Sequence, residues 1–138
     1  MSSPLWRRRG LPAPNRHFHD SCYVYIPPIE LKRIRVKANA MACFLSGWLK
    51  RPVKVPSLVR FYTGNSAMYY ADSNTVVLGA KAIIFGGFSE DIHLIHELLH
   101  GYFPDSAGLF NKAGEQKIVS MEAPALKAWY KAIGRLPV

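Results

Sequence analysis

Two histidines and a glutamate form a short pattern in the second half of this 138-residue chain, within the segment DIHLIHELLHGYF (residues 91–103). His96 and His100 are four residues apart, so on a helix both imidazoles project from one face, one turn above the other. This spacing lets both rings reach one ion, and Glu97 stands where a carboxylate can hold a water molecule without binding the metal. The His-Glu-x-x-His pattern therefore predicts two zinc ligands and a general base for hydrolysis.

A catalytic zinc site needs a third protein ligand, which this pattern does not contain. The extended pattern with a further Gly and His fails, because Phe103 and Ser106 occupy those positions and no histidine follows them. The remaining ligand must then be an acid, and the downstream candidates are Asp105, Glu115 and Glu122. Asp105 comes too soon after the helix to fold back, whereas the other two lie seven apart on one face of the last predicted helix. Spacing alone leaves the choice between these two open.

Other polar residues around the motif have more than one interpretation. His93, one turn before His96, is either an outer contact to the ligands, an alternative ligand, or a partly exposed helix residue. The motif itself could also be a helix with two surface histidines and an exposed glutamate. A transition-state hydrogen bond could come from several tyrosines, and the sequence does not choose among Tyr69, Tyr70, Tyr102 and Tyr130.

Helical periodicity predicts the elements on both sides of this motif. Apolar residues recur every three or four positions between Ile29 and Arg51, which predicts a helix with its basic residues on the outside. Ser89 is the predicted N-cap of the motif helix, which runs to about Phe103. The last helix is predicted from about Glu115 to Ile133, with a proline that bends it or splits off its first turns.

Three short segments between the first helix and the motif helix have the composition of β-strands. They are SLVRFY (57–62), AMYYA (67–71) and TVVL (75–78), each rich in β-branched or aromatic residues. Turn clusters separate them, so the sequence predicts an antiparallel meander. Together the segments predict an α+β fold.

Residues 58–129 resemble the gluzincin branch of the zinc metallopeptidases, and most of all its small single-domain prokaryotic and viral members. The resemblance is carried by the meander, the HELLH motif and the segment GEQKIVSMEAPALKAW. It implies a minimal zincin-like domain, with zinc as the cofactor. It also implies Glu115 as the third ligand, with Glu122 in reserve. The strand at 75–78 would then line the cleft and bind a peptide or protein substrate by β-addition.

The net charge of +9 is unevenly distributed along the chain. Residues 1–60 contain 12 Lys or Arg against 2 Asp or Glu, whereas residues 61–138 contain 6 against 7. The basic front half favours a polyanionic or assembly partner, and a solvated basic helix is the equal alternative. Residues 1–28 are predicted to form an extended basic arm in front of a single domain at 29–138.

No apolar run approaches the roughly 20 residues of a membrane span. No apolar segment follows the N-terminal arginines either, so we expect no secretion and a cytoplasmic, virus-encoded intracellular or virion-associated location. The two cysteines, Cys22 and Cys43, are expected to be free thiols. Two functions fit: a zinc-dependent metallopeptidase with Glu97 as general base, or a non-catalytic component of a virion or nucleoprotein assembly on a peptidase-like scaffold.

Overall fold

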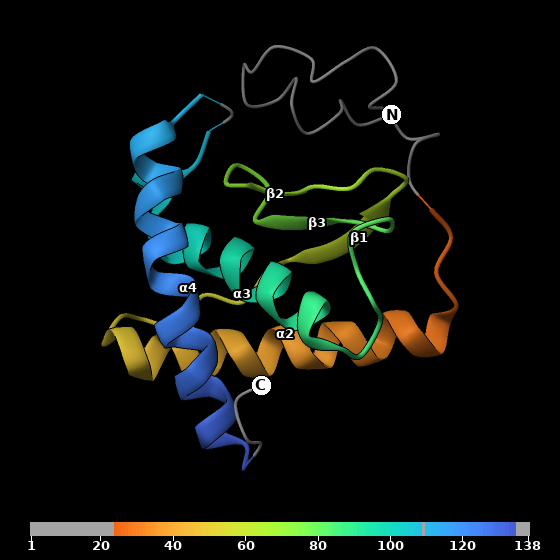
Figure 1. Cartoon of the computed structure of the whole chain (residues 1–138), viewed down its shortest axis with the longest axis horizontal. Coiled ribbons are helices and arrows are strands. Elements are labelled where there is room, and N and C mark those ends of the chain that lie inside the picture. The colour runs from red at the N-terminus through yellow and green to blue at the C-terminus, as the bar shows by residue number, and fades with distance from the viewer. Residues whose placement is uncertain (1–23, 109, 135–138) are drawn as a thin grey trace.

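The computed structural model describes residues 24–108 and 110–134 of the chain. Within them the chain is α+β, with three α-helices, a short 3-10 helix and a three-stranded mixed sheet, in the order α2 (Pro28–Leu49), β1 (Leu58–Tyr62), β2 (Ala67–Tyr70), β3 (Thr75–Gly79), α3 (Phe88–Tyr102), η2 (Pro104–Ser106) and α4 (Lys112–Ala132). Figure 1 shows α3 between the sheet and α2, with α4 crossing both helices. The predicted arm at residues 1–28 lies mostly outside the described residues.

The first predicted helix is confirmed as α2. Pro28 suits its first turn, because a proline there lacks only an N–H that would have no helical partner. The helix ends at Lys50, which adopts the left-handed conformation. One face enters the core through side chains spaced three and four apart, namely Ile34, Ala38, Met41, Ala42 and Leu45.

The predicted antiparallel meander is wrong in its topology. The strand order is β1-β3-β2, with β1 parallel and β2 antiparallel to β3. The reason lies in β3, whose residues are apolar on both faces and all buried, so it takes the central position. Two rows of core-facing side chains cross the sheet: Val76 lies between Val59 and Tyr69, and Leu78 lies between Phe61 and Ala67.

The crossing that this topology requires occurs at Gly79. The segment from β1 to β2 passes over the end of β3, where Lys81 N–H donates to the carbonyl of Gly64 at 3.0 Å. A Cβ atom on Gly79 would lie 2.5 Å from the carbonyl oxygens of Gly64 and Ser66. Glycine is therefore required here because backbone lies where any side chain would stand.

The helix that carries the histidines starts earlier than predicted. Its N-cap is Gly87, so the assignment of Ser89 as the cap is wrong. The Ser89 hydroxyl instead accepts a hydrogen bond from the N–H of Ile84 and donates one to the carbonyl of Ala82. The serine therefore fixes the loop that leads into α3 rather than the first turn itself.

A buried charge network joins α3 to α2 and α4. Glu90 and Asp91 are fully buried, and Lys37 Nζ lies 2.5 Å from the first carboxylate and 2.7 Å from the second. Arg33 binds Glu90 at 2.6 Å, and the Tyr130 hydroxyl donates to Asp91 at 2.7 Å. Burial alone would raise the pKa of Glu90, but these cations outweigh it and hold that pKa at about 2. The prediction of a basic outer face on α2 is wrong for Arg33 and Lys37.

The interior is one main apolar cluster between the helices and the core face of the sheet. It combines side chains from α2, β1, β3, α3 and α4, so the histidine-bearing helix is held on several sides. In the described part of the chain, no helix combines the length and the apolar character that crossing a bilayer requires.

Candidate metal centre

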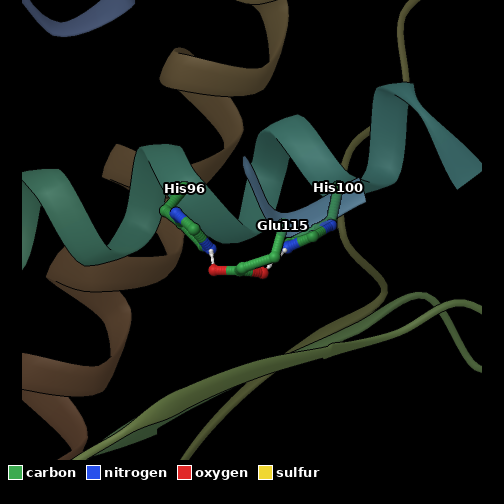
Figure 2. Close-up of side chains that lie close together, drawn as sticks. All are labelled: His96, His100 and Glu115. Carbon is green, nitrogen blue, oxygen red and sulfur yellow. Dashed lines mark hydrogen bonds and ion pairs between the residues drawn. The ribbon is translucent and has the colours of Figure 1, made fainter. Parts of the chain in front are cut away.

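Three side chains from two helices converge at the face of α3 that looks toward β2. His96 Nε2 lies 2.7 Å from one oxygen of Glu115, and His100 Nε2 lies 3.0 Å from the other. Figure 2 shows both imidazoles pointing from α3 to this single carboxylate. One ligand atom from each of the three residues lies within 4.8 Å of the others, so the group could hold a metal ion.

The outer nitrogen of each imidazole also has a partner. His96 Nδ1 lies 2.7 Å from the carboxylate of Glu122, which can only accept, so this nitrogen donates. His100 Nδ1 lies 2.9 Å from the hydroxyl of Ser106, whose own proton goes to the carbonyl of Phe103. Both rings are thereby held with Nδ1 at an outer partner and Nε2 directed at the centre of the group, the arrangement that metal-binding histidines need.

Glu97 lies beside this group and is almost entirely buried, at 3% exposed. One of its oxygens is 3.8 Å from His96 Nε2. Burial raises the pKa of Glu97 well above its usual range, and repulsion from the carboxylates of Glu115 and Glu122 raises it further. A carboxylate whose pKa is raised accepts a proton more readily than an exposed one, which suits a general base.

The start of α4 determines where Glu115 stands. Asn111 caps the helix, because its side-chain oxygen accepts from the N–H of Gly114 at 2.9 Å, while its amide nitrogen donates to the carbonyl of Asp105. Gly114 packs against η2 so closely that a Cβ atom would lie 2.4 Å from the carbonyl oxygen of Ser106. The first turn of α4, which carries Glu115, and Ser106 of η2 are therefore packed firmly against each other.

Two hollows adjoin the cluster on either side. One, of about 150 Å³, is lined by β2, the three clustered residues and the loop at Ala107 and Gly108. The other, of about 450 Å³, is lined by Ser66, Ala67 and residues of α3 and α4. The smaller hollow lies along β2, an outer strand of the sheet, and the larger one reaches the first residue of that strand, Ala67.

The expectation that the strand at 75–78 lines the cleft is wrong. That segment is β3, which is buried and paired on both sides, so it has no free edge for a substrate. The strand beside the cluster is β2, because all four of its residues line the smaller hollow. The chain order of the strands misled the prediction, since the last strand before α3 lies in the middle of the sheet.

The other candidate residues take different positions. His93 lines the larger hollow, but its contact in the described part of the chain is Nδ1 to the carbonyl of Ser89 at 2.6 Å, away from the cluster. Asp105 is exposed and outside the ligand group. The hydroxyls of the four candidate tyrosines bond to protein atoms, namely Tyr69 to Asn74, Tyr70 to Met68, Tyr102 to Ala42 and Tyr130 to Asp91.

Ser106 contacts the cluster although its sequence position did not indicate it. In the sequence it stands only where the extended zinc pattern would have a histidine. Pro104, which opens η2, was the available signal, since a tight turn there returns the chain to the last turn of α3. No family model matches this chain, and neither the curated proteins nor the solved structures yield a match.

Proposed function

We propose that this chain is a zinc-dependent metallopeptidase in which His96, His100 and Glu115 hold the metal and Glu97 is the general base. The observation that carries the proposal is the meeting of both Nε2 atoms at one carboxylate from a different helix. Two imidazoles and a carboxylate are a ligand set of catalytic zinc sites, which leave a further position for water or substrate.

The donor set fits zinc in type and in protonation. Imidazole nitrogen and carboxylate oxygen are both zinc ligands, and each ring already donates its Nδ1 proton elsewhere, to Glu122 and to Ser106. The partial exposure of Glu115 and the adjoining hollows give an ion a path to the cluster. Zinc in such a site supplies a Lewis acid and lowers the pKa of water to about 7.

Glu97 would move the proton in this reaction. Its carboxylate takes a proton from the attacking water and delivers it to the amine that leaves the cleaved peptide bond. The burial that raises its pKa supports this role, because it makes the carboxylate a stronger base than an exposed one. His96 and His100 hold the ion, while Glu122 and Ser106 keep the two rings in position.

The substrate would lie as an extended strand along β2, beside both hollows. This places a scissile carbonyl next to the cluster without using β3. The helix with the HExxH motif and an acidic residue on the following helix beside it support the resemblance to the small gluzincins, although that resemblance implied a different strand along the cleft. We therefore propose the same zincin-like class for the fold.

Metal analysis and hydrolysis of a fluorescent casein test the proposal together. We expect about one zinc per chain, and activity that a chelator removes and zinc restores. Glu97→Gln should retain zinc and lose at least about 100-fold in rate, since general-base catalysis contributes about 10² to 10⁴. Glu30→Gln is the matched control on α2, and it should cleave like the unaltered chain. Cleavage by Glu97→Gln at the normal rate would refute the mechanism.

The non-catalytic alternative predicts a different result. An assembly component on the same scaffold would bind zinc through the same three residues and show no metal-dependent cleavage of any peptide pool. Zinc bound with full occupancy, without activity in a broad peptide library, would therefore favour that alternative. Absence of zinc binding would refute the metallopeptidase and leave an assembly component that acts through its basic half.

A further inference from the structure

A second hollowed surface lies at the opposite edge of the sheet from the candidate metal centre. β1 is the outer strand there, since the order is β1-β3-β2. Two adjoining hollows of about 250 and 560 Å³ lie between β1, the N-terminal half of α2 and the segment at residues 24–26. They share Val24, Ile26, Leu31 and Arg35, so together they form one groove, here called the β1 groove.

The floor of the β1 groove is apolar and reaches solvent. Tyr25 and Val36 are 79% and 60% exposed, and both line the larger hollow. Leu58, Val59 and Phe61 of β1 form the wall of the smaller hollow. Large apolar side chains that remain this exposed around a groove are typical of a site that another polypeptide covers.

The rim of this groove is positively charged. Lys32 and Arg35 are exposed on α2 and line it, Arg60 lines it from β1, and no acidic residue appears among the described residues around either hollow. Glu30, the acid of the same stretch of α2, is bound to Arg33. Other basic residues of the front half, Lys37 among them, are used inside the protein. The exposed cations that line the groove are therefore Lys32 and Arg35.

The backbone of β1 already accepts a partner on this side. Val24 N–H donates to the carbonyl of Phe61 at 2.9 Å, so that carbonyl faces away from β3. Because backbone groups two residues apart in a strand face the same edge, Val59 directs its N–H and C=O into the groove as well. An extended segment could therefore bond to this edge while its side chains enter the hollows.

We propose that the β1 groove binds an extended acidic segment of a partner protein, in which carboxylates alternate with apolar side chains. The apolar residues would enter the two hollows, and the carboxylates would meet Lys32 and Arg35. A nucleic acid fits less well, because most side chains that line the two hollows are aliphatic, and Tyr25 is the exposed aromatic ring among the described residues that line them. A second copy of this chain fits less well too, since a two-fold contact would bring the same cations together.

Fluorescence polarisation with a labelled decapeptide tests this inference on the full chain. The peptide alternates Glu or Asp with Val or Leu, and mass spectrometry confirms that it stays intact. We expect binding to weaken at least tenfold in the double variant Lys32→Glu/Arg35→Glu. Lys127→Glu/Lys131→Glu on α4 is the matched control and should bind within about twofold of the unaltered chain. Unchanged melting temperatures show that both variants are folded.

Two further probes make the result decisive. A decapeptide with Ser in place of every Val and Leu should bind at least tenfold more weakly, because it cannot fill the hollows. Equal binding of both peptides, or equal losses in both double variants, would mean that only net charge matters, and would overturn the inference. Tighter binding of a ten-nucleotide single strand that Lys32→Glu/Arg35→Glu abolishes would overturn it in favour of nucleic acid. Neither outcome depends on peptidase activity.

Discussion

Glu122 accepts a hydrogen bond from Nδ1 of His96 at 2.7 Å, on the opposite side of the imidazole from Glu115. The two glutamates therefore have different roles around one ring. Removing an outer partner of a metal-binding histidine lowers metal affinity by about 10- to 100-fold. We expect this loss for Glu122→Ala and a smaller one for Glu122→Gln, whereas Glu115→Ala should abolish stoichiometric zinc binding. Competition with a chromophoric chelator measures all three, and zinc retained by Glu115→Ala but lost from Glu122→Ala would reverse these roles.

Ser106 should matter for the metal site although it binds no metal. Ser106→Ala removes the acceptor for Nδ1 of His100, so the ring can rotate or change its tautomer. We expect zinc affinity to fall about tenfold, by the same reasoning as for an outer partner. Ser120→Ala on α4 is the matched control, because that hydroxyl bonds only to the carbonyl of Lys117 among the described residues. Equal affinities for the two variants would rule out the orienting role of Ser106.

Two glycine-to-alanine substitutions in helices should have opposite effects. At Gly114 the added Cβ would lie 2.4 Å from backbone of Ser106, so α4 must shift and unfolding by urea should need less denaturant. At Gly47 nothing lies within 4 Å, and alanine should stabilise α2 by about 0.5 to 1 kcal/mol. We also expect weaker zinc binding only for Gly114→Ala, since Glu115 follows directly. A Gly114→Ala protein as stable as the unaltered chain would contradict the close packing.

Acid should weaken the fold through Glu90. Its native pKa of about 2 lies below the value of about 4.3 in an unfolded chain. The stabilisation is therefore complete above about pH 5 and is lost as the pH falls toward 2. Glu90→Gln should lower the free energy of unfolding by about 3 kcal/mol at pH 7, because the partly buried Arg33 and Lys37 each lose their bond to this buried carboxylate. Urea denaturation at several pH values should then show a flatter acid dependence for Glu90→Gln than for Glu30→Gln.

In chelator-treated protein, Glu97→Gln should be more stable than the unaltered chain at pH 8. The buried Glu97 carboxylate faces two other carboxylates there, and glutamine removes that repulsion. Since the native pKa of Glu97 is raised, the folded chain takes up a proton first as the pH falls, and the difference should shrink toward pH 5. Thermal melting at both pH values measures it. A difference that grows on acidification would contradict the raised pKa.

The helical part of the fold could be predicted from sequence because its signals are local. The three- and four-residue periodicity gave the helices that became α2, α3 and α4, and prolines gave approximate ends for two of them. The position of Glu115 beside the histidines agrees with what the gluzincin resemblance implied. The role of Glu122 did not follow, because seven-residue spacing places both acids on one face without showing which imidazole nitrogen each one meets.

The sheet and the outer partners could not be predicted because they depend on contacts between distant segments. Composition located the three strands but did not show that β3 would be inserted between β1 and β2. Lys37 looked like a solvent-facing lysine of an amphipathic helix, since nothing near it in sequence reveals the buried Glu90 and Asp91. Ser106 contacts His100 only because η2 turns the chain back toward α3, and the sequence does not show this turn directly.

The central position of β3 also determines the order in which the strands can pair during folding. β2 and β3 are joined by a short turn, so they can pair early and independently of the rest. β1 can pair with β3 only after the chain has passed through β2, so that Leu58 comes to lie opposite Thr75. The segment that connects β1 to β2 must also come to lie against Gly79. Because distant pairing of this kind is slow, the docking of β1 should limit the folding rate. A bulky residue at Gly79 should then slow refolding more than it accelerates unfolding.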